Sequence, residues 1–194
     1  MPHRSTRGVT ITVLGALAIV ACACLPPAKT ARDTGRWAYL CCTMRFNPSR
    51  EASDANYDYR DKTVIPAGTQ VFVKVDGSKA VFVLNGQPAG YSIEFRYGRK
   101  ALTASQYFDR LFVAEDPVRG LPDNPALRDA VRDGKLAVGM TKDEAIMARG
   151  YPPAHHTPTT DGDDWLYYAH YQLCEQVHFV DGRIASIEQM PPPS

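Results

Sequence analysis

The sequence lacks the features that mark several common classes of protein. It has no run or stripe of basic residues, and its 22 Lys and Arg nearly balance 21 Asp and Glu, leaving a net charge of +1. Nucleic-acid binding depends on clustered basic side chains, so no nucleic-acid partner is expected. Gly-x-Ser-x-Gly, His-Glu-x-x-His and phosphate-binding Gly motifs are absent, as is the CxxC-like spacing of zinc sites. The sequence therefore predicts a binding protein without cofactor or metal rather than an enzyme.

The sequence also lacks a long apolar run near its start. Residues 9–20 are apolar and follow a basic segment with His3, Arg4 and Arg7. A membrane-spanning helix needs roughly 20 apolar residues, so the shorter run is typical of a secretory signal peptide. We interpret residues 1–21 as that signal; the alternative is a buried N-terminal helix.

The end of this segment resembles a lipoprotein signal. Residues 19–22 read IVAC, which is similar to the bacterial lipobox, in which the cysteine becomes the acylated first residue. Cys24 fits the pattern less well than Cys22. Several acyl chains anchor stably because each buried CH₂ contributes about 0.8 kcal/mol. Ala23, rather than Asp, after Cys22 is similar to lipoproteins sorted to the outer membrane, facing the periplasm. Residues 22–35 are then a tether, and Cys22 is the expected membrane attachment.

Four further cysteines meet an oxidising compartment if the chain is exported. Cys41 and Cys42 are adjacent, and neighbouring cysteines rarely bridge each other because the geometry is strained. We expect at most one disulfide, from Cys41 or Cys42 to Cys174. The alternative for Cys174 is a small apolar residue within a strand.

The first half of the exported chain has a β-rich pattern. Residues 37–46 predict a first strand and residues 47–62 a long loop. Residues 70–75, 80–84 and 91–97 predict three strands separated by tight turns, and apolar spacing predicts a helix at residues 103–112. The IPAGT turn before the first hairpin resembles an SH3-like barrel, so residues 36–114 are expected to form such a small barrel or sheet. Three prolines at residues 117–125 mark a boundary.

The second half predicts two helices and three strands. Asn124 can cap a first helix that Gly134 ends, and Thr141 with Glu144 can form a capping box for a second helix, which ends at Gly150. Residues 165–168, 175–180 and 183–187 predict strands, the last two joined by an Asp-Gly turn. We expect two helices packed on a three-stranded antiparallel sheet, which makes the whole chain α+β.

The same half carries a family resemblance. Residues 135–145 read KLAVGMTKDEA, and RGYPP, WLYY and VHFVDGRI follow in order. This set resembles the BamE-like (SmpA/OmlA) domain over residues 122–190. The resemblance implies a non-catalytic outer-membrane lipoprotein that binds partners during β-barrel assembly. The segment YPPAHHTP resembles a GYPPAHRTP segment in an uncharacterised group of bacterial lipoproteins.

The best candidate for a partner-binding site is the loop at residues 151–164. It is rich in Pro, Thr and Asp, and loops held by rigid elements often carry binding residues. The candidate residues are Tyr151, Pro152, Pro153, His155, His156 and Trp165. The alternative is a proline-stiffened connector.

Two chemical alternatives use the histidines. Four-residue steps in a strand span about 13 Å, so His170, Cys174 and His178 lie too far apart for one metal ion, and His155 with His156 cannot complete a tetrahedral site. A Cys174 nucleophile with His170 or His178 as base is a further alternative.

The expected function is a lipid-anchored envelope scaffold that binds envelope proteins, in outer-membrane protein assembly or envelope integrity. The alternative is a module that binds a soluble ligand or peptidoglycan, or that inhibits an enzyme, since the BamE-like fold resembles β-lactamase inhibitory proteins.

Overall fold

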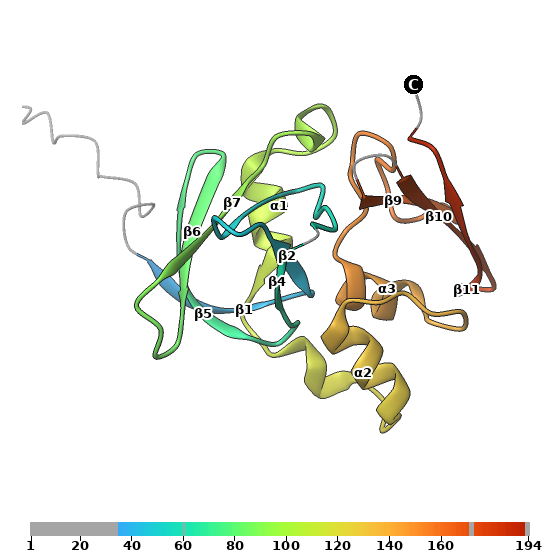
Figure 1. The fold of residues 1–194 in the computed structure, drawn as a ribbon, viewed down its shortest axis with the longest axis horizontal. Helices are drawn as coiled ribbons and strands as arrows, with labels where there is room; N and C mark the ends of the chain where they lie inside the picture. Colours follow the sequence, from blue (N-terminus) through green and yellow to red (C-terminus); the bar gives the residue numbers. More distant parts are fainter. Residues whose placement is uncertain (1–34, 60, 171–172, 193–194) are drawn as a thin grey trace, which may run out of the picture. The chain divides into compact units, whose positions relative to one another are not determined.

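The computed structural model describes residues 35–59, 61–170 and 173–192 (Figure 1). All of these belong to one compact unit, residues 31–194. The expected signal peptide, the acylation site Cys22 and nearly all of the tether lie outside the described residues.

The described chain is mixed α+β, as predicted. Its strands are β1 (Arg36–Leu40), β2 (Met44–Phe46), β3 (Glu51–Ser53), β4 (Thr63–Ile65), β5 (Gln70–Asp76), β6 (Lys79–Leu84), β7 (Gly90–Glu94), β8 (Phe112–Val113), β9 (Asp164–His170), β10 (Leu173–Val180) and β11 (Arg183–Met190). Its helices are α1 (Ala104–Leu111), α2 (Pro125–Asp133) and α3 (Lys142–Arg149), with short 3-10 turns at Gly98–Lys100 and Pro117–Gly120.

A six-stranded sheet has the order β3-β7-β6-β5-β1-β8. Strands β5, β6 and β7 form an antiparallel meander, which confirms the three strands predicted in this region. Inward and outward residues alternate along β5, where Val71 and Val73 are buried and Phe72 is exposed. This alternation leaves one sheet face for the core and the other for solvent.

Two predictions in the N-terminal part were wrong in detail. The single strand expected at residues 37–46 is divided into β1 and β2, which belong to different sheets because the chain bends at Cys41–Cys42. The expected loop at residues 47–62 contains β3, which adds to the sheet edge parallel to β7. A three-residue strand has too little periodicity to be recognised from its sequence.

The C-terminal part has the predicted three-stranded antiparallel sheet, in the order β11-β10-β9. The helix boundaries are also those predicted. Asn124 accepts a hydrogen bond from the N–H of Leu127 at 3.2 Å, and Gly134 ends α2 in the left-handed conformation. Thr141 and Glu144 form the complete capping box of α3, which satisfies N–H groups that the first helical turn leaves unpaired.

The buried apolar side chains form two clusters. The first contains Tyr107, Phe108 and Leu111 from α1 together with inward residues of the six-stranded sheet. The second draws on α2, α3 and the three-stranded sheet, with Trp165 and Phe179 at a ring separation of 4.5 Å.

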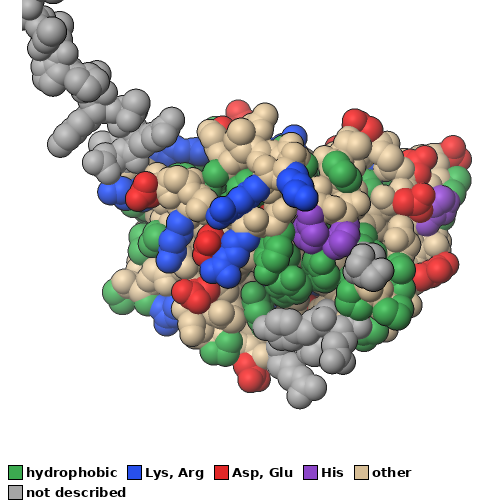
Figure 2. Space-filling model, turned by 90° about the horizontal axis from the view of Figure 1, so that it is seen from above, with side chains coloured by type: hydrophobic (Ala, Val, Ile, Leu, Met, Phe, Trp, Pro, Cys, Tyr) green, Lys and Arg blue, Asp and Glu red, His purple; other side chains and the backbone are tan. Residues whose placement is uncertain are grey.

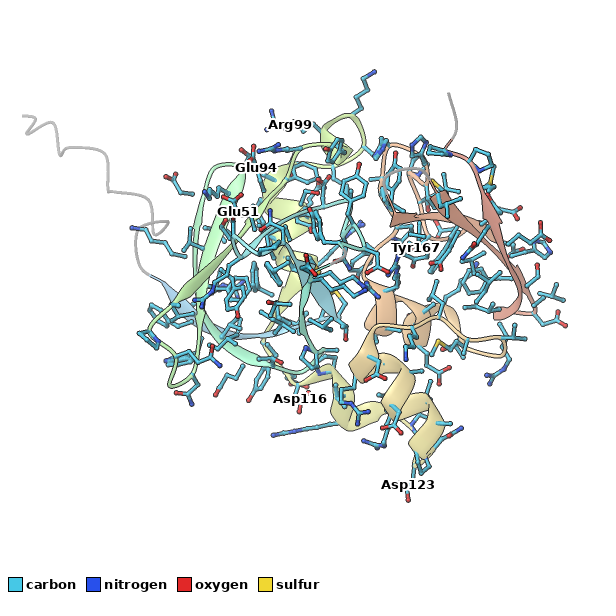
Figure 3. The ribbon with its side chains drawn as sticks, viewed as in Figure 1. Glu51, Glu94, Arg99, Asp116, Asp123 and Tyr167 are labelled. Carbon is cyan, nitrogen blue, oxygen red and sulfur yellow. A yellow bond between two sulfur atoms is a disulfide. The ribbon has the colours of Figure 1, made fainter. Side chains whose placement is uncertain are left out.

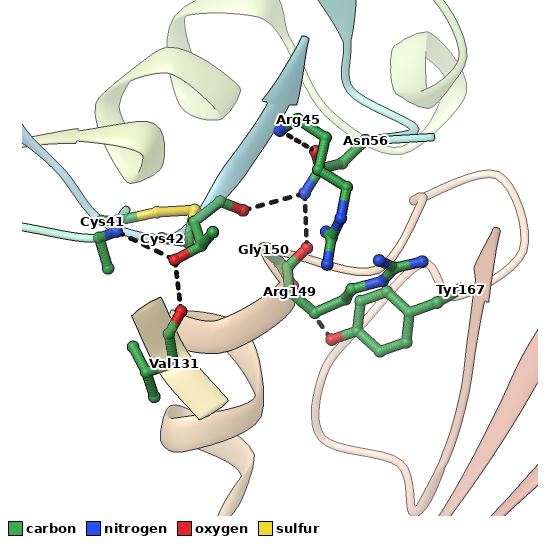
Figure 4. The surroundings of a disulfide bond; sticks show 10 residues. Cys41, Cys42, Arg45, Asn56, Val131, Arg149, Gly150 and Tyr167 are labelled. Carbon is green, nitrogen blue, oxygen red and sulfur yellow. Dashed lines mark hydrogen bonds between the residues drawn. A yellow bond between two sulfur atoms is a disulfide. The ribbon is translucent and has the colours of Figure 1, made fainter. Parts of the chain in front are cut away.

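A buried polar network connects the residues of the two clusters (Figure 4). The Asn56 amide nitrogen donates to the carbonyl oxygens of Arg149 at 2.7 Å and Thr43 at 3.2 Å, and its oxygen accepts from the Arg45 N–H at 2.9 Å. The Thr43 hydroxyl donates to the carbonyl of Val131 at 2.6 Å. We call Thr43, Arg45, Asn56 and Arg149 the polar seam.

The seam contains two buried guanidinium groups. Arg45 donates to the carbonyl of Gly134, but its Nε and Nη1 atoms have no hydrogen-bond partner within the described chain. Burial, followed by the charge of Arg149, lowers the pKa of Arg45 to about 9, so Arg45 remains cationic at neutral pH. The nearest counter-ions are Asp58, 3.7 Å from Arg45, and Glu175, 3.6 Å from Arg149.

The cysteines do not pair as predicted. Cys41 and Cys42 are bonded to each other, and Cys174 is a free, fully buried thiol in β10. The expected bridge from Cys41 or Cys42 to Cys174 is therefore corrected. The strain expected of a bond between neighbouring cysteines argued against this pairing, and residue spacing does not show the bend between β1 and β2 at which it forms.

Candidate functional site

The loop that follows α3 is held against β9 by specific hydrogen bonds. Gly150 ends the helix, and its carbonyl accepts from the hydroxyl of Tyr167 at 3.0 Å. The Thr157 hydroxyl accepts from the N–H of Leu166 at 3.1 Å, and the Thr157 N–H donates to the carbonyl of Pro153. The segment between Gly150 and Thr157 is thereby fixed at both ends, which positions the two histidines.

Both histidines converge on one phenol. The Nε2 atoms of His155 and His156 lie 3.1 Å and 2.8 Å from the Tyr168 hydroxyl. A phenol has one hydrogen, so with neutral imidazoles Tyr168 donates to one ring and accepts from the other. Burial, followed by the neighbouring His156, lowers the pKa of His155, and burial raises the pKa of Tyr168. The neutral forms of His155 and Tyr168 are therefore favoured.

Tyrosines from the N-terminal part extend this cluster. The ring of Tyr57 lies 4.8 Å from that of Tyr168 and 6.1 Å from that of Tyr97, and Tyr97 lies 5.5 Å from His155. Tyr59 packs edge-on against Tyr57. Burial, followed by the proximity of Tyr97, raises the pKa of Tyr57. We define the aromatic–histidine surface as the set Tyr57, Tyr59, Tyr97, His155, His156 and Tyr168.

Tyr97 is positioned by a buried carboxylate. Asp54 accepts hydrogen bonds from the backbone N–H groups of Arg96, Tyr97 and Gly98, the last at 2.7 Å. These contacts fix the backbone after β7 and leave the Tyr97 side chain 40% exposed. Figure 2 shows two adjacent histidine side chains beside hydrophobic side chains, with basic side chains close by.

A surface pocket adjoins the tyrosines. It has a volume of about 240 Å³ and is lined by Asn47, Glu51, Ala52, Ser53, Tyr57, Tyr59, Arg96 and Tyr97. Glu51 and Glu94 come from the paired strands β3 and β7, and Figure 3 shows both acids in the same part of the molecule as Arg99. The pocket thus combines aromatic faces with polar and charged groups.

The structure separates the sequence-predicted loop residues into two groups. His155 and His156 reach the surface, whereas Pro152 and Pro153 are buried and Tyr151 is half-buried beside Arg110. Trp165 is 0% exposed within the second cluster, and it cannot contact a partner without unfolding. Trp165, Pro152 and Pro153 are therefore corrected from partner contacts to structural residues.

The tyrosines of the surface were missed in the sequence. Tyr57 and Tyr59 stand in a polar stretch expected to be a loop, and aromatic residues in such a stretch were the available signal. Nothing local indicates that Tyr57, Tyr97 and Tyr168, from distant parts of the sequence, meet.

The described residues give little support to the chemical alternatives. No group of three or more His, Cys, Asp or Glu with metal-binding geometry occurs among them, and the side chain of His170 is not described. Burial raises the pKa of the Cys174 thiol, whereas a nucleophilic cysteine requires a lowered one. His178 is exposed on the same strand and lies 2.9 Å from Asp164. Cys174 is buried and His178 is exposed, so the two do not form a nucleophile and base.

Among the helices of the described residues, none has the length and apolar content needed to cross a membrane. The chain matches no protein-family description, no curated protein and no solved structure.

Proposed function

We propose that the chain is a non-enzymatic envelope lipoprotein, anchored to the outer membrane through acylated Cys22 and facing the periplasm. In this proposal it binds an envelope protein through the aromatic–histidine surface. The observation that carries the binding role is the gathering of four tyrosines and two histidines from four chain segments at one partly exposed place. Tyrosine is enriched at the energetic centres of protein interfaces, because a large ring buries much area and retains a polar end.

The proposal includes the two modules inferred from the sequence. Residues 36–114 would form an SH3-like module, which is supported by the meander of β5, β6 and β7. Residues 122–190 would form a BamE-like module, which is supported by the antiparallel sheet of β9, β10 and β11 and by the two capped helices before it. The partners would then be components of outer-membrane protein assembly or proteins that maintain envelope integrity.

In-cell photocrosslinking tests the binding role. A photoreactive phenylalanine is placed at Tyr97, and crosslinked products are identified by mass spectrometry. The same probe at Val138, which is 68% exposed elsewhere on the surface, is the control. We expect barrel-assembly proteins to crosslink at position 97 and not at position 138.

Histidine variants locate the contact. His155→Ala with His156→Ala removes both hydrogen bonds to Tyr168 and should reduce the crosslinked product. His178→Ala removes an exposed histidine that is paired with Asp164, and it should leave the product unchanged. Equal crosslinking in all variants, or no protein product at position 97, would reject the surface as a protein-binding site.

The pocket beside the tyrosines favours a second candidate, binding of peptidoglycan. Its volume of about 240 Å³ and its mixture of tyrosines with Asn47, Glu51 and Arg96 suit a sugar that presents a flat apolar face and polar edges. Co-sedimentation with purified wall sacculi that is lost in Tyr97→Ala would favour this candidate over a protein partner. Retention of a soluble enzyme instead would favour the inhibitor alternative.

A further inference from the structure

The outward face of the six-stranded sheet carries an apolar row close to the start of the described chain. Trp37 on β1 is paired with Phe72 on β5, and Phe72 is paired with Val83 on β6. Residues in such cross-strand register project on the same side of a sheet. Val81, two residues before Val83 on β6, lies on the same face. The Cγ1 atom of each valine lies 3.8 Å from the position that a Cβ on Gly90 would occupy.

Three of these side chains are exposed to solvent, and Val83 is partly buried. Trp37 is 53% exposed, Val81 47% and Phe72 40%, and the rings of Trp37 and Phe72 pack edge-on at 5.5 Å. Isolated exposed apolar residues are common, but a contiguous group that includes a tryptophan indicates an interaction surface. The polar residues that flank the row are of both signs, Lys74 and Lys79 with Asp76 and Glu94, so the face has no preference for a strongly charged partner.

The position of the row relative to the anchor identifies its partner. Trp37 follows Cys22 by only fifteen residues, which span at most about 50 Å when fully extended. A short tether holds a surface at an effective concentration of the order of millimolar, so even weak affinity for the bilayer suffices for docking. Tryptophan is the residue most suited to the interface, where its ring lies among the headgroups.

We infer that this face, defined by Trp37, Phe72, Val81 and Val83, docks on the lipid bilayer to which the chain is anchored. The inference rests on the proposed acylation of Cys22. Docking places the apolar row at the boundary of headgroups and acyl chains, with Lys74 and Lys79 at headgroup level. It fixes the orientation of residues 35–192 on the membrane instead of leaving them free on the tether.

The two tryptophans of the chain make the test specific. Trp37 is exposed and Trp165 is fully buried, so quenching from the bilayer reports on Trp37. The acylated full-length product is reconstituted into phosphatidylcholine and phosphatidylethanolamine vesicles, with or without bromine on the acyl chains. We expect bromolipid to quench the emission and to shift the remainder to shorter wavelength. Trp37→Phe removes the signal and leaves the unquenched emission of Trp165.

A double variant tests the row itself. Phe72→Ser with Val81→Ser removes two exposed apolar groups without opening a core cavity, and it should lower the docking equilibrium constant roughly tenfold or more. Val138→Ser, at an apolar position that is more exposed and lies outside the sheet, should leave quenching unchanged.

The outcomes separate the inference from its premise. Intact-mass measurement reports acylation independently of fluorescence. An acylated chain whose Trp37 is not quenched by bromolipid overturns docking and leaves the anchor standing. A chain without acyl groups overturns the anchor, and the inference falls with it. If acrylamide cannot reach Trp37 in the non-acylated Cys22→Ser chain without lipid, protein covers the face and docking is likewise overturned.

Discussion

Replacing Asn56 tests whether the polar seam holds the fold together. Its side chain makes three buried hydrogen bonds, to the N–H of Arg45 and to the carbonyls of Thr43 and Arg149. Asn56 also has a positive φ of 45°, which asparagine tolerates better than other side chains. In Asn56→Ala all three hydrogen bonds are lost, and the backbone of an alanine must adopt the left-handed conformation.

The magnitude follows from these two losses. A buried group left without its hydrogen-bond partner costs about 1–3 kcal/mol, and a left-handed alanine costs about 1 kcal/mol more. We expect Asn56→Ala to lower the free energy of unfolding by about 4 kcal/mol, a large fraction of the 5–15 kcal/mol typical of a domain. Asn56→Gly loses the same hydrogen bonds without the conformational penalty, so it should be about 1 kcal/mol more stable than the alanine variant.

Urea unfolding of the Cys22→Ser chain, followed by circular dichroism, measures these differences as shifts in midpoint at constant slope. Asp181→Ala is the matched control, because Asp181 has a φ of 51° in an exposed turn. It isolates the backbone effect, about 1 kcal/mol. If Asn56→Ala is no more destabilising than Asp181→Ala, the seam does not stabilise the fold and the reasoning fails.

Three further results are expected. Gly134→Ala places a Cβ 2.6 Å from the Arg45 guanidinium at a φ of +70°, so it should lower the free energy of unfolding by about 2–3 kcal/mol. Gly182 is the control, because its φ is +73° and the space around it is open; Gly182→Ala should cost only about 1 kcal/mol. The folded-state pKa of His155 lies below its ordinary value of 6.5, so its contribution to stability is complete above pH 6.5 and is lost as pH falls through the folded pKa. The free energy of unfolding should therefore depend less on pH in His155→Gln than in the unsubstituted chain, as measured by urea unfolding across this pH range. Peptide mass spectrometry after alkylation should show Cys174 reacting only in the unfolded chain and Cys41–Cys42 only after reduction, whereas alkylation of folded Cys174 would contradict its burial.

The parts of the fold that were predictable depend on local chemistry. The capping box of Thr141 and Glu144 needs only residues three positions apart, and the turn at Asp181–Gly182 joins adjacent strands. The separation of β1 from β2 depends on partners far along the chain. All three residues of β2 are buried, so this strand lacks the alternation of buried and exposed residues that identifies a strand in a sequence. Nothing in the sequence indicates that Arg45, at its centre, is buried as well.

The same distinction explains the candidate site. His155 and His156 were predictable because their loop has an unusual composition of its own. Their contact with Tyr168 depends on the fold of that loop against β9, and the approach of Tyr57 and Tyr97 depends on the docking of distant segments. Trp165 was assigned wrongly because a tryptophan beside a polar loop gives no local sign of whether it faces the core or the surface.

The two buried arginines connect the seam to the candidate site. Arg45 is paired with Asp58, which lies between Tyr57 and Tyr59, and Arg149 donates to the carbonyl of Tyr168 at 2.6 Å. Each arginine therefore holds a segment that carries tyrosines of the aromatic–histidine surface. Buried charges often contribute little net stability and are retained for the arrangement that they impose.

Arg149→Met tests this positioning role. The substitution keeps much of the side-chain volume, removes a hydrogen bond and relieves the repulsion with Arg45, so the free energy of unfolding should change by only about 1 kcal/mol. Tyr168 would lose a contact that fixes its backbone, and the protein crosslinks formed from position 97 should decrease. His178→Ala removes a side-chain contact with Asp164 on the same sheet outside the seam, so it should leave both quantities unchanged. A strongly destabilised Arg149→Met chain that crosslinks normally would show that the arginine serves the fold and not the surface.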